Sequence, residues 1–403
     1  MRLPLLLEPL RHRDFRLLWT GQTVSIFGNS LHQIAVPFQL LALGASPVQL
    51  GVGASISTAV SLVLFLYAGA IVDRIPRRRV ILLCDLGSGV VVMAIALLSI
   101  TGNLRIEHIY LESAFFGASG AFFFPAMGAI IPELVPAEIL IQGNTVRSFS
   151  RQGARLAGPA IGGVIVASQG PGWAFLIDSL TFLFSFLVLL AASPSTVIAA
   201  VRQPILREIR EGITFTLSLP WLWITILIFA FGNMVYAGPL IVAMPLLVRD
   251  VLLADASVFG LISSSFAVGE VIGGIVLGQL KVHRVGITMY AAAVLSSVAL
   301  ALYGLLPVYP ALLLYGLGVG FGQLGFGVLW DSALQRHVPR ALLGRVSSVD
   351  GFGSILLLPI APLAAGALAE RFGPAAVLAG GGLIGASLCV FALLIPSIRG
   401  LRS

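Results

Sequence analysis

The apolar residues of this chain are gathered into long runs, and these runs constrain its fold more than any other feature. A bilayer core about 30 Å thick requires roughly 20 apolar residues per helix, and twelve such segments can be placed along the 403 residues. They lie near 16–43, 48–72, 78–100, 106–131, 139–168, 173–192, 219–248, 255–280, 285–306, 309–335, 342–369 and 374–396. Only 10% of the residues are charged, whereas a soluble domain has about a quarter. We therefore predict an all-α membrane protein with twelve transmembrane helices.

The basic residues give the expected orientation. If the amino end lies in the cytoplasm, 21 of the 24 Lys and Arg residues fall on the cytoplasmic side, and only Arg105, Arg249 and Arg371 fall on the other. This asymmetry is typical of a multi-pass protein of a bacterial-type inner (plasma) membrane with both termini in the cytoplasm. The net charge of +7 comes from short clusters between apolar runs, a pattern that argues against a nucleic-acid partner.

A repeat relates the two halves of the chain. Four landmarks recur at an offset of 203 residues: Val135-Pro136, Gly158-Pro159, Gly163 and Gly170-Pro171 correspond to Val338-Pro339, Ala361-Pro362, Gly366 and Gly373-Pro374. We predict an N-terminal six-helix bundle over 1–192, a cytoplasmic linker over 193–218 and a C-terminal six-helix bundle over 219–403. Parallel repeats of this kind place the substrate site near the membrane midplane between the halves.

Several motifs resemble those of one transporter family. The loop that reads Gly-Ala-Ile-Val-Asp-Arg-Ile-Pro-Arg-Arg over 69–78 resembles the G-x-x-x-D-R-x-x-R-R signature of the major facilitator superfamily. The stretch Gly-Pro-Ala-Ile-Gly-Gly over 158–163 is similar to a motif of its antiporters, and the stretches 14–19, 25–28 and 211–215 resemble the branch with macrolide exporters and the enterobactin exporter. The resemblance covers essentially the whole chain and implies two pseudo-symmetric six-helix bundles.

The resemblance also implies roles for these motifs. The loop would latch the outward-facing state against residues near 342–344, although a basic loop that only sets topology is the alternative; its residues are Gly69, Asp73, Arg74, Arg77 and Arg78. The glycine-proline stretch would allow its helix to bend as the halves rock, or would serve packing alone; its residues are Gly158, Pro159, Gly162 and Gly163.

Polar side chains recur every three to four residues in the first apolar segment, which predicts one polar helix face. We expect this face to line a wet cavity, with hydrogen bonding between helices as the alternative. The expected cavity-lining residues are Gln22, Ser25, Asn29 and Gln33, with His32 beside them and Asn233 and Tyr236 in the equivalent region of the second half.

Ionisable residues within membrane spans are costly and indicate function. The proton-coupling candidates are Glu270, Asp178, Glu112 and Asp350. Glu270 is the first choice because its segment is otherwise apolar or small, and pairing with a neighbouring helix is the alternative. Arg147, with Arg151 one turn further on, and Asp350 are candidates for a gate pair or a static structural pair. Asp85 and Asp331 are expected to bind nearby arginines.

The sequence contains no phosphate-binding loop, zinc-protease motif or Cys-x-x-Cys pair, so we expect no enzyme, no cofactor and no metal. The leading hypothesis is a proton-coupled exporter of amphipathic or hydrophobic small molecules, such as drugs or siderophores, that works by alternating access as a monomer in the lipid bilayer. An importer or a lysophospholipid or lipid flippase on the same fold is the alternative. A non-transporting scaffold or sensor would have no use for the polar face or for Glu270.

Overall fold

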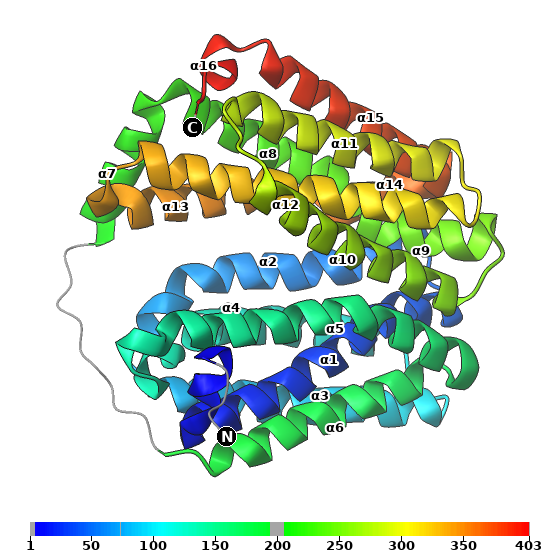
Figure 1. Cartoon of the computed structure of the whole chain (residues 1–403). Coiled ribbons are helices and arrows are strands. Elements are labelled where there is room, and N and C mark those ends of the chain that lie inside the picture. Colours follow the sequence, from blue (N-terminus) through cyan, green and yellow to red (C-terminus); the bar gives the residue numbers. More distant parts are fainter. Residues whose placement is uncertain (1–4, 73, 194–204, 403) are drawn as a thin grey trace. The chain divides into compact units, whose positions relative to one another are not determined.

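The computed structural model describes residues 5–72, 74–193 and 205–402, and within these residues the secondary structure is entirely helical (Figure 1). The first part of the chain contains η1 (Leu5–Arg11), α1 (Arg13–Ala42), α2 (Pro47–Val72), α3 (Arg77–Ile100), α4 (Ile106–Leu134), η2 (Ala137–Ile139), α5 (Leu140–Gln169) and α6 (Pro171–Leu190). The second contains α7 (Ile205–Ser218), α8 (Pro220–Gly238), η3 (Pro239–Ala243), α9 (Met244–Leu246), η4 (Leu247–Val251), α10 (Ala256–Gln279), α11 (Val285–Leu305), α12 (Ala311–His337), α13 (Arg340–Ile355), α14 (Ala361–Phe372), α15 (Pro374–Leu393) and α16 (Pro396–Arg399).

The chain forms two compact units. The first contains α1, α2 from Ile56 onward, α3 to α6, and the start of α10 as far as Ser264. The second contains the start of α2, the helices from α7 to α9, and the chain from Ser265 onward. Each unit has its own apolar core, which in the second is rich in aromatic residues such as Trp221, Tyr290 and Trp330.

The repeat predicted from the sequence produces the same turn in both units. Gly170 connects α5 to α6 with φ at 89°, and Gly373 connects α14 to α15 with φ at 82°. Both values lie in the region that favours glycine. A proline follows each glycine at the first helical position, where its missing N–H costs nothing. The two halves therefore share a local design.

Nine helical segments within the described residues are long and apolar enough to cross a membrane: α2, α3, α4, α6, the α8 to η4 segment, α10, α11, α12 and α15. The predicted spans near 16–43 and 139–168 correspond to α1 and α5, which have 30 residues each and a more polar composition. The span near 342–369 corresponds to α13 and α14 together, so each of the twelve predicted segments is mainly helical. The structure is an all-helical membrane protein.

Two of the spans are not regular α-helices throughout. The segment after α8 contains the π-helical turns η3 and η4, with Pro239 and Pro245 within it. The chain between α13 and α14 forms turns over 356–360, where Pro359 cannot donate a backbone hydrogen bond. By contrast, α5 continues through Pro159 as one helix. The same proline landmark is therefore tolerated in one repeat, while the other is interrupted just before it.

Four helices of the first unit position the buried polar groups described below. α6 packs along both α1 and α3, and α4 packs against α3 and α1 (Figure 1). Small residues on α1 permit this close packing: a Cβ on Gly21 would lie 2.9 Å from Ser185 Oγ of α6. Side chains from α1, α3, α4 and α6 consequently meet inside one bundle.

Candidate functional site

A histidine in the first unit lies between two carboxylates that come from different helices. His32 of α1 places Nε2 2.9 Å from Oε1 of Glu112 on α4 and Nδ1 3.1 Å from Oδ2 of Asp178 on α6. The exposed fractions of the three residues are 7%, 2% and 0%. We call this cluster the His32 site. The structure thus brings together two of the predicted proton-coupling carboxylates and one predicted cavity residue.

Aromatic rings fix the imidazole in this position. Phe116 stacks on the His32 ring with centroids 4.7 Å apart, and Phe175 meets it edge-on at 5.3 Å. Phe116 comes from the same helix as Glu112, one turn further on, and Phe175 lies one turn before Asp178 on α6. The rings keep bulk water away from the charged groups and restrict the rotamer of the histidine.

Gly28 makes room for the second carboxylate. A Cβ at this position, one turn before His32, would lie 2.1 Å from Oγ1 of Thr181 and 2.6 Å from Oδ1 of Asp178. Any larger residue on α1 would force α6 or its side chains away. The glycine therefore sets the distance between the imidazole and Asp178.

The charges of the His32 site do not balance unless it holds protons. With both carboxylates ionised, a neutral imidazole leaves two negative charges and an imidazolium leaves one, and uncompensated charge is costly inside a protein. Within the described residues, His32 is the one ion-pair partner of both Glu112 and Asp178. Groups this close exchange protons as one coupled system rather than as three separate acids. The arrangement can bind and release protons inside a membrane-spanning bundle.

The burial of the predicted polar face of α1 changes along the helix. Gln22 and Ser25 are buried, Asn29 is half-buried and Gln33 is exposed. Gln22 Nε2 donates at 3.0 Å to Oδ2 of Asp85 on α3. The expectation that Asp85 binds an arginine was wrong, because the partners of its carboxylate are Gln22 and, through a hydroxyl, Ser185 of α6.

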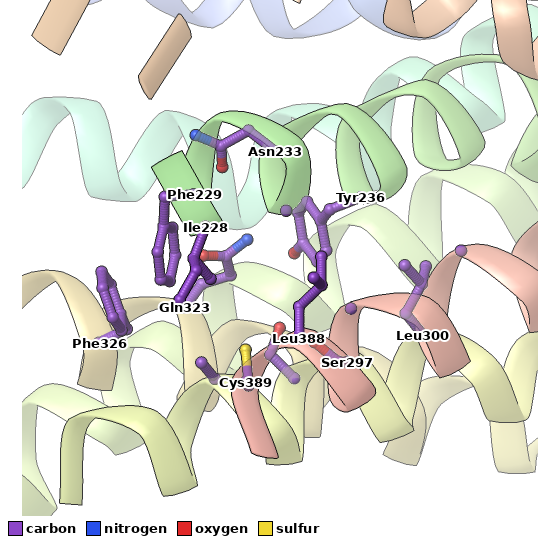
Figure 2. A pocket seen from close by; sticks show the side chains of 15 residues that line it. Ile228, Phe229, Asn233, Tyr236, Ser297, Leu300, Gln323, Phe326, Leu388 and Cys389 are labelled. Atoms are coloured by element: carbon purple, nitrogen blue, oxygen red, sulfur yellow. The ribbon is translucent and has the colours of Figure 1, made fainter. Parts of the chain in front are cut away.

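The second unit contains a small pocket of about 30 Å³ in which Asn233 and Tyr236 of α8 take part (Figure 2). Phe229 and Phe326 stack face to face on one side of it, with centroids 3.8 Å apart. The lining combines aromatic, amide and hydroxyl groups and includes no Asp, Glu, Lys or Arg among the described residues. The full lining is Ile228, Phe229, Gly232, Asn233, Tyr236, Ala293, Ser296, Ser297, Leu300, Gln323, Phe326, Gly381, Gly385, Leu388 and Cys389. A cavity of this volume holds about one or two water molecules.

The other ionisable candidates lie elsewhere. Glu270 is half-buried on α10. Asp350 on α13 accepts hydrogen bonds from Trp330 Nε1 at 2.9 Å and Ser354 Oγ at 3.3 Å. Arg147 on α5 donates to the carbonyl of Met127 at 3.3 Å. Because Arg147 and Asp350 belong to different units, their pairing stays a prediction, as does the role of Glu270.

The arginines of the predicted latch loop make contacts within the first unit. Arg78 donates to the carbonyl oxygens of Leu189 and Leu190 at 3.1 and 2.7 Å, so it caps the carboxyl end of α6, where cations are favoured. Arg77 Nε lies 3.4 Å from Glu133 Oε1 of α4. Arg74 is exposed, and Asp73 lies outside the described residues. The latch itself stays a prediction.

The glycine-proline stretch of α5 is a close packing surface. A Cβ on Gly158 would lie 2.3 Å from Ser30 Cβ, and one on Gly162 would lie 3.0 Å from Leu31 Cα. Both glycines therefore face α1 and let the two helices approach closely. Whether α5 bends at Pro159 during transport stays a prediction.

Solved structures show which fold this protein has. It is similar to a bacterial homologue of the iron transporter ferroportin in an inward-facing state, with a TM-score of 0.72, 16% identity, and coverage of 94% of this chain and 98% of that one. It is also similar to a POT family transporter in complex with 5-aminolevulinic acid, with a TM-score of 0.73, 13% identity and 96% coverage of both chains. These likenesses show the fold, which is that of the major facilitator superfamily transporters.

A family model identifies the branch. The transmembrane secretion effector model matches residues 6–399, so the chain belongs to this family of major facilitator transporters, which are not enzymes. Among its relatives, the enterobactin exporter EntS of Citrobacter koseri is 25% identical over 356 residues, covering 86% of this chain and 85% of the relative. The EntS of Escherichia coli O81 is also 25% identical, over 360 residues, with the same coverage. The resemblance stated from the motifs is confirmed.

Sequence reasoning identified Glu112, Asp178 and His32 separately but not their contact. The signal available was weak, because His32 lies one residue away from the polar face that drew attention to α1. Phe116 and Gly28 carried no signal that separates them from other aromatic and small residues in spans. Only the packing of α4 and α6 on α1 shows that these side chains form one site.

Proposed function

We propose that this protein is a proton-coupled exporter of amphipathic small molecules that works by alternating access. The observation that carries the proposal is the His32 site, in which His32 contacts Glu112 and Asp178 in the interior of the first unit. Buried ionisable groups in membrane spans are expensive to maintain and typically serve ion or proton translocation. The similarity to the enterobactin exporters EntS supports the direction of transport.

Proton binding at this site would shift the balance between the two access states. Adding one proton changes the charge of a water-excluded cluster by one unit, and a ligand shifts a conformational equilibrium by the difference in its affinity for the two states. The contacts of His32 with Glu112 and Asp178 join α1 to α4 and α6. Their strength depends on whether the imidazole and the carboxylates are protonated, so a change in protonation changes how firmly these helices are held together. A proton entering from the outer face would drive return of the carrier after export.

The relatives and the lining of the pocket in the second unit support the proposed substrate class. Stacked aromatic rings beside the amides of Asn233 and Gln323 suit a molecule with an aromatic or apolar body and neutral polar groups. An aromatic siderophore or an amphipathic drug has this chemistry. We further propose that the protein acts as a monomer in the inner membrane. The distribution of Lys and Arg residues supports a cytoplasmic position for both termini.

Transport into everted membrane vesicles tests the proposal. Vesicles with the wild-type chain should accumulate members of an amphipathic panel when a proton gradient is present, and a protonophore should abolish the accumulation. Glu112→Gln and Asp178→Asn should lose it, whereas Glu107→Gln should not, because Glu107 is exposed on the same helix.

The same experiment separates the alternatives. Glu270→Gln is measured alongside these variants. If it loses accumulation while the variants of the His32 site keep it, Glu270 couples protons; the opposite result assigns the coupling to the His32 site. Movement of substrate in the opposite direction would indicate an importer, and movement of a labelled lipid alone would indicate a flippase. Accumulation that survives the protonophore would refute proton coupling.

A further inference from the structure

A third buried carboxylate in the first unit has no part in the His32 site. Asp85 of α3 is 1% exposed. Its Oδ2 accepts hydrogen bonds from Ser185 Oγ at 2.7 Å and from Gln22 Nε2 at 3.0 Å, while its Oδ1 has no partner within the described residues. An acceptor that is buried and unpaired in this way requires an explanation.

The groups around Asp85 are neutral. Gln22 and Ser185 reach it from α1 and α6. On the α4 side, the neighbouring Cys84 thiol of α3 points instead to the backbone carbonyl of Ser119, at 3.6 Å. No cation of the described residues lies at ion-pair distance from the carboxylate. An ionised Asp85 would therefore be a buried charge without a counter-charge, which is costly.

Three basic residues begin α3, and none of them pairs with Asp85. Arg78 binds the carbonyl oxygens at the end of α6, Arg77 faces Glu133, and Arg79 is exposed. All three lie about two helical turns before Asp85, which is roughly 10 Å along the axis. They mark the end of the bundle that the topology assigns to the cytoplasm, so Asp85 lies toward that end.

The hydrogen-bond network can accommodate both protonation states of Asp85. Gln22 Nε2 also donates to Ser185 Oγ at 3.0 Å, so the amide and the hydroxyl form a closed set around Oδ2. These donors stabilise the ionised carboxylate. The free Oδ1 leaves a position where a proton can be held without breaking any of the existing bonds.

A seam of small and polar residues between α1 and α6 connects Asp85 with the His32 site. On α6, Asp178 and Ser185 are seven residues apart, about two turns or 10 Å, and Thr181 lies between them. On α1, Gly28 lies against Thr181 and Asp178, and Ser25 is buried one turn before it. Polar groups therefore recur at every turn between the two carboxylates.

We propose that Asp85 is a second proton-binding site, and that protons pass between it and the His32 site along the seam of α1 and α6. This inference rests on the proposed proton coupling and extends it. In the transfer, one proton leaves the imidazole or a carboxyl of the His32 site and one proton joins the Asp85 carboxylate, so that the total charge of the first unit is unchanged. The route lies within the first unit and is separate from the pocket of the second.

Infrared difference spectroscopy of the full chain in lipid vesicles, recorded during a pH titration, tests the proposal. The wild type should show carbonyl bands from protonated carboxylic acids that titrate with pH, and Asp85→Asn should lose the component that Asp85 contributes while the component from Glu112 and Asp178 remains. Asp331→Asn is the matched control, because Asp331 is an exposed aspartate on α12, and it should leave the Asp85 component unchanged.

A second variant keeps the test decisive if Asp85→Asn does not fold. Ser185→Ala keeps the carboxylate but removes a hydrogen-bond donor to it, and should move the titration midpoint of the Asp85 band. A difference spectrum that is identical in Asp85→Asn and wild type, or a midpoint that Ser185→Ala does not move, would overturn the proposal.

A transport assay completes the design. Asp85→Asn should retain exchange of substrate between equal pools but lose accumulation driven by a proton gradient. The infrared band does not depend on transport, so the failures are distinguishable. If export proves independent of protons while the band titrates, the proposed function fails and the proton site stands; if export is proton-driven and Asp85→Asn accumulates substrate normally, the inference fails alone.

Discussion

Replacement of Gly28 by alanine tests whether close packing of α1 and α6 holds the His32 site together. The new Cβ would lie 2.1 Å from Thr181 Oγ1 and 2.6 Å from Asp178 Oδ1, so α6 or both side chains must move by about 1 Å or more to reach ordinary contact. Overpacking of this kind costs about 1–3 kcal/mol. Alanine is also favoured over glycine within a helix by about 1 kcal/mol, so the net change in stability is small. The larger effect should be on the 3.1 Å contact between Asp178 and His32.

A matched alanine variant separates the cost of overpacking from the helix preference of alanine. Gly153 of α5 is exposed, and a Cβ there would meet nothing within 4 Å, so Gly153→Ala gains only the helix preference. In equilibrium unfolding in mixed micelles, Gly28→Ala should be less stable than Gly153→Ala by about 1–3 kcal/mol. In vesicles, Gly28→Ala should lose gradient-driven accumulation and Gly153→Ala should keep it. Equal stability and equal accumulation of the two variants would refute the packing argument.

Two further predictions concern hydrogen bonds outside the His32 site. Trp330→Phe removes the indole donor to Asp350 and should lower the free energy of unfolding by about 1–3 kcal/mol, whereas Trp173→Phe, at a position that is 45% exposed, should not; equal losses in both would contradict the assignment. Asp255 caps α10 by accepting hydrogen bonds from the backbone N–H and hydroxyl of Ser257 at 2.9 and 2.5 Å, and these bonds lower the pKa of its carboxyl. Asp255→Ala should therefore speed amide exchange in the first turn of α10, at a cost of about 1 kcal/mol. The difference from wild type should be full above about pH 4, the ordinary pKa of aspartate, and should be lost as the pH falls through the lower folded pKa; a difference that does not depend on pH would show that the charge of the cap is unimportant.

The spans and the repeat could be predicted from the sequence because both depend on local composition. A lipid-facing helix must be apolar for about 20 residues wherever it lies in the fold, so hydropathy alone located the segments that became α1 to α6 and α8 to α15. The Gly170-Pro171 and Gly373-Pro374 turns depend only on the conformational freedom of glycine and the fixed φ of proline. Their similar φ values of 89° and 82° agree with the predicted repeat at these landmarks.

The interruption of the span near 342–369 could not be placed from the sequence. Pro159 lies inside an unbroken α5, while the chain before the equivalent Pro362 forms turns. The extra Pro359 marks this position, but prolines in membrane helices are often tolerated when neighbouring groups satisfy the freed carbonyl. The outcome depends on the surrounding helices, which the local sequence does not describe.

Taken by itself, the sequence determined the class of this protein, because lipid imposes a strict rule on composition and length and because the motifs of the major facilitator superfamily are contiguous in the chain. It also selected Glu112 and Asp178, since a charge within a span is conspicuous anywhere. Only the tertiary structure decided that His32 of α1 meets both carboxylates and that Asp85 is bound by neutral donors instead of an arginine. These contacts join residues from 63 positions apart, for Gln22 and Asp85, to 146 positions apart, for His32 and Asp178. They depend on the close approach of α6 to α1 that glycines permit, a consequence of packing that no local pattern encodes.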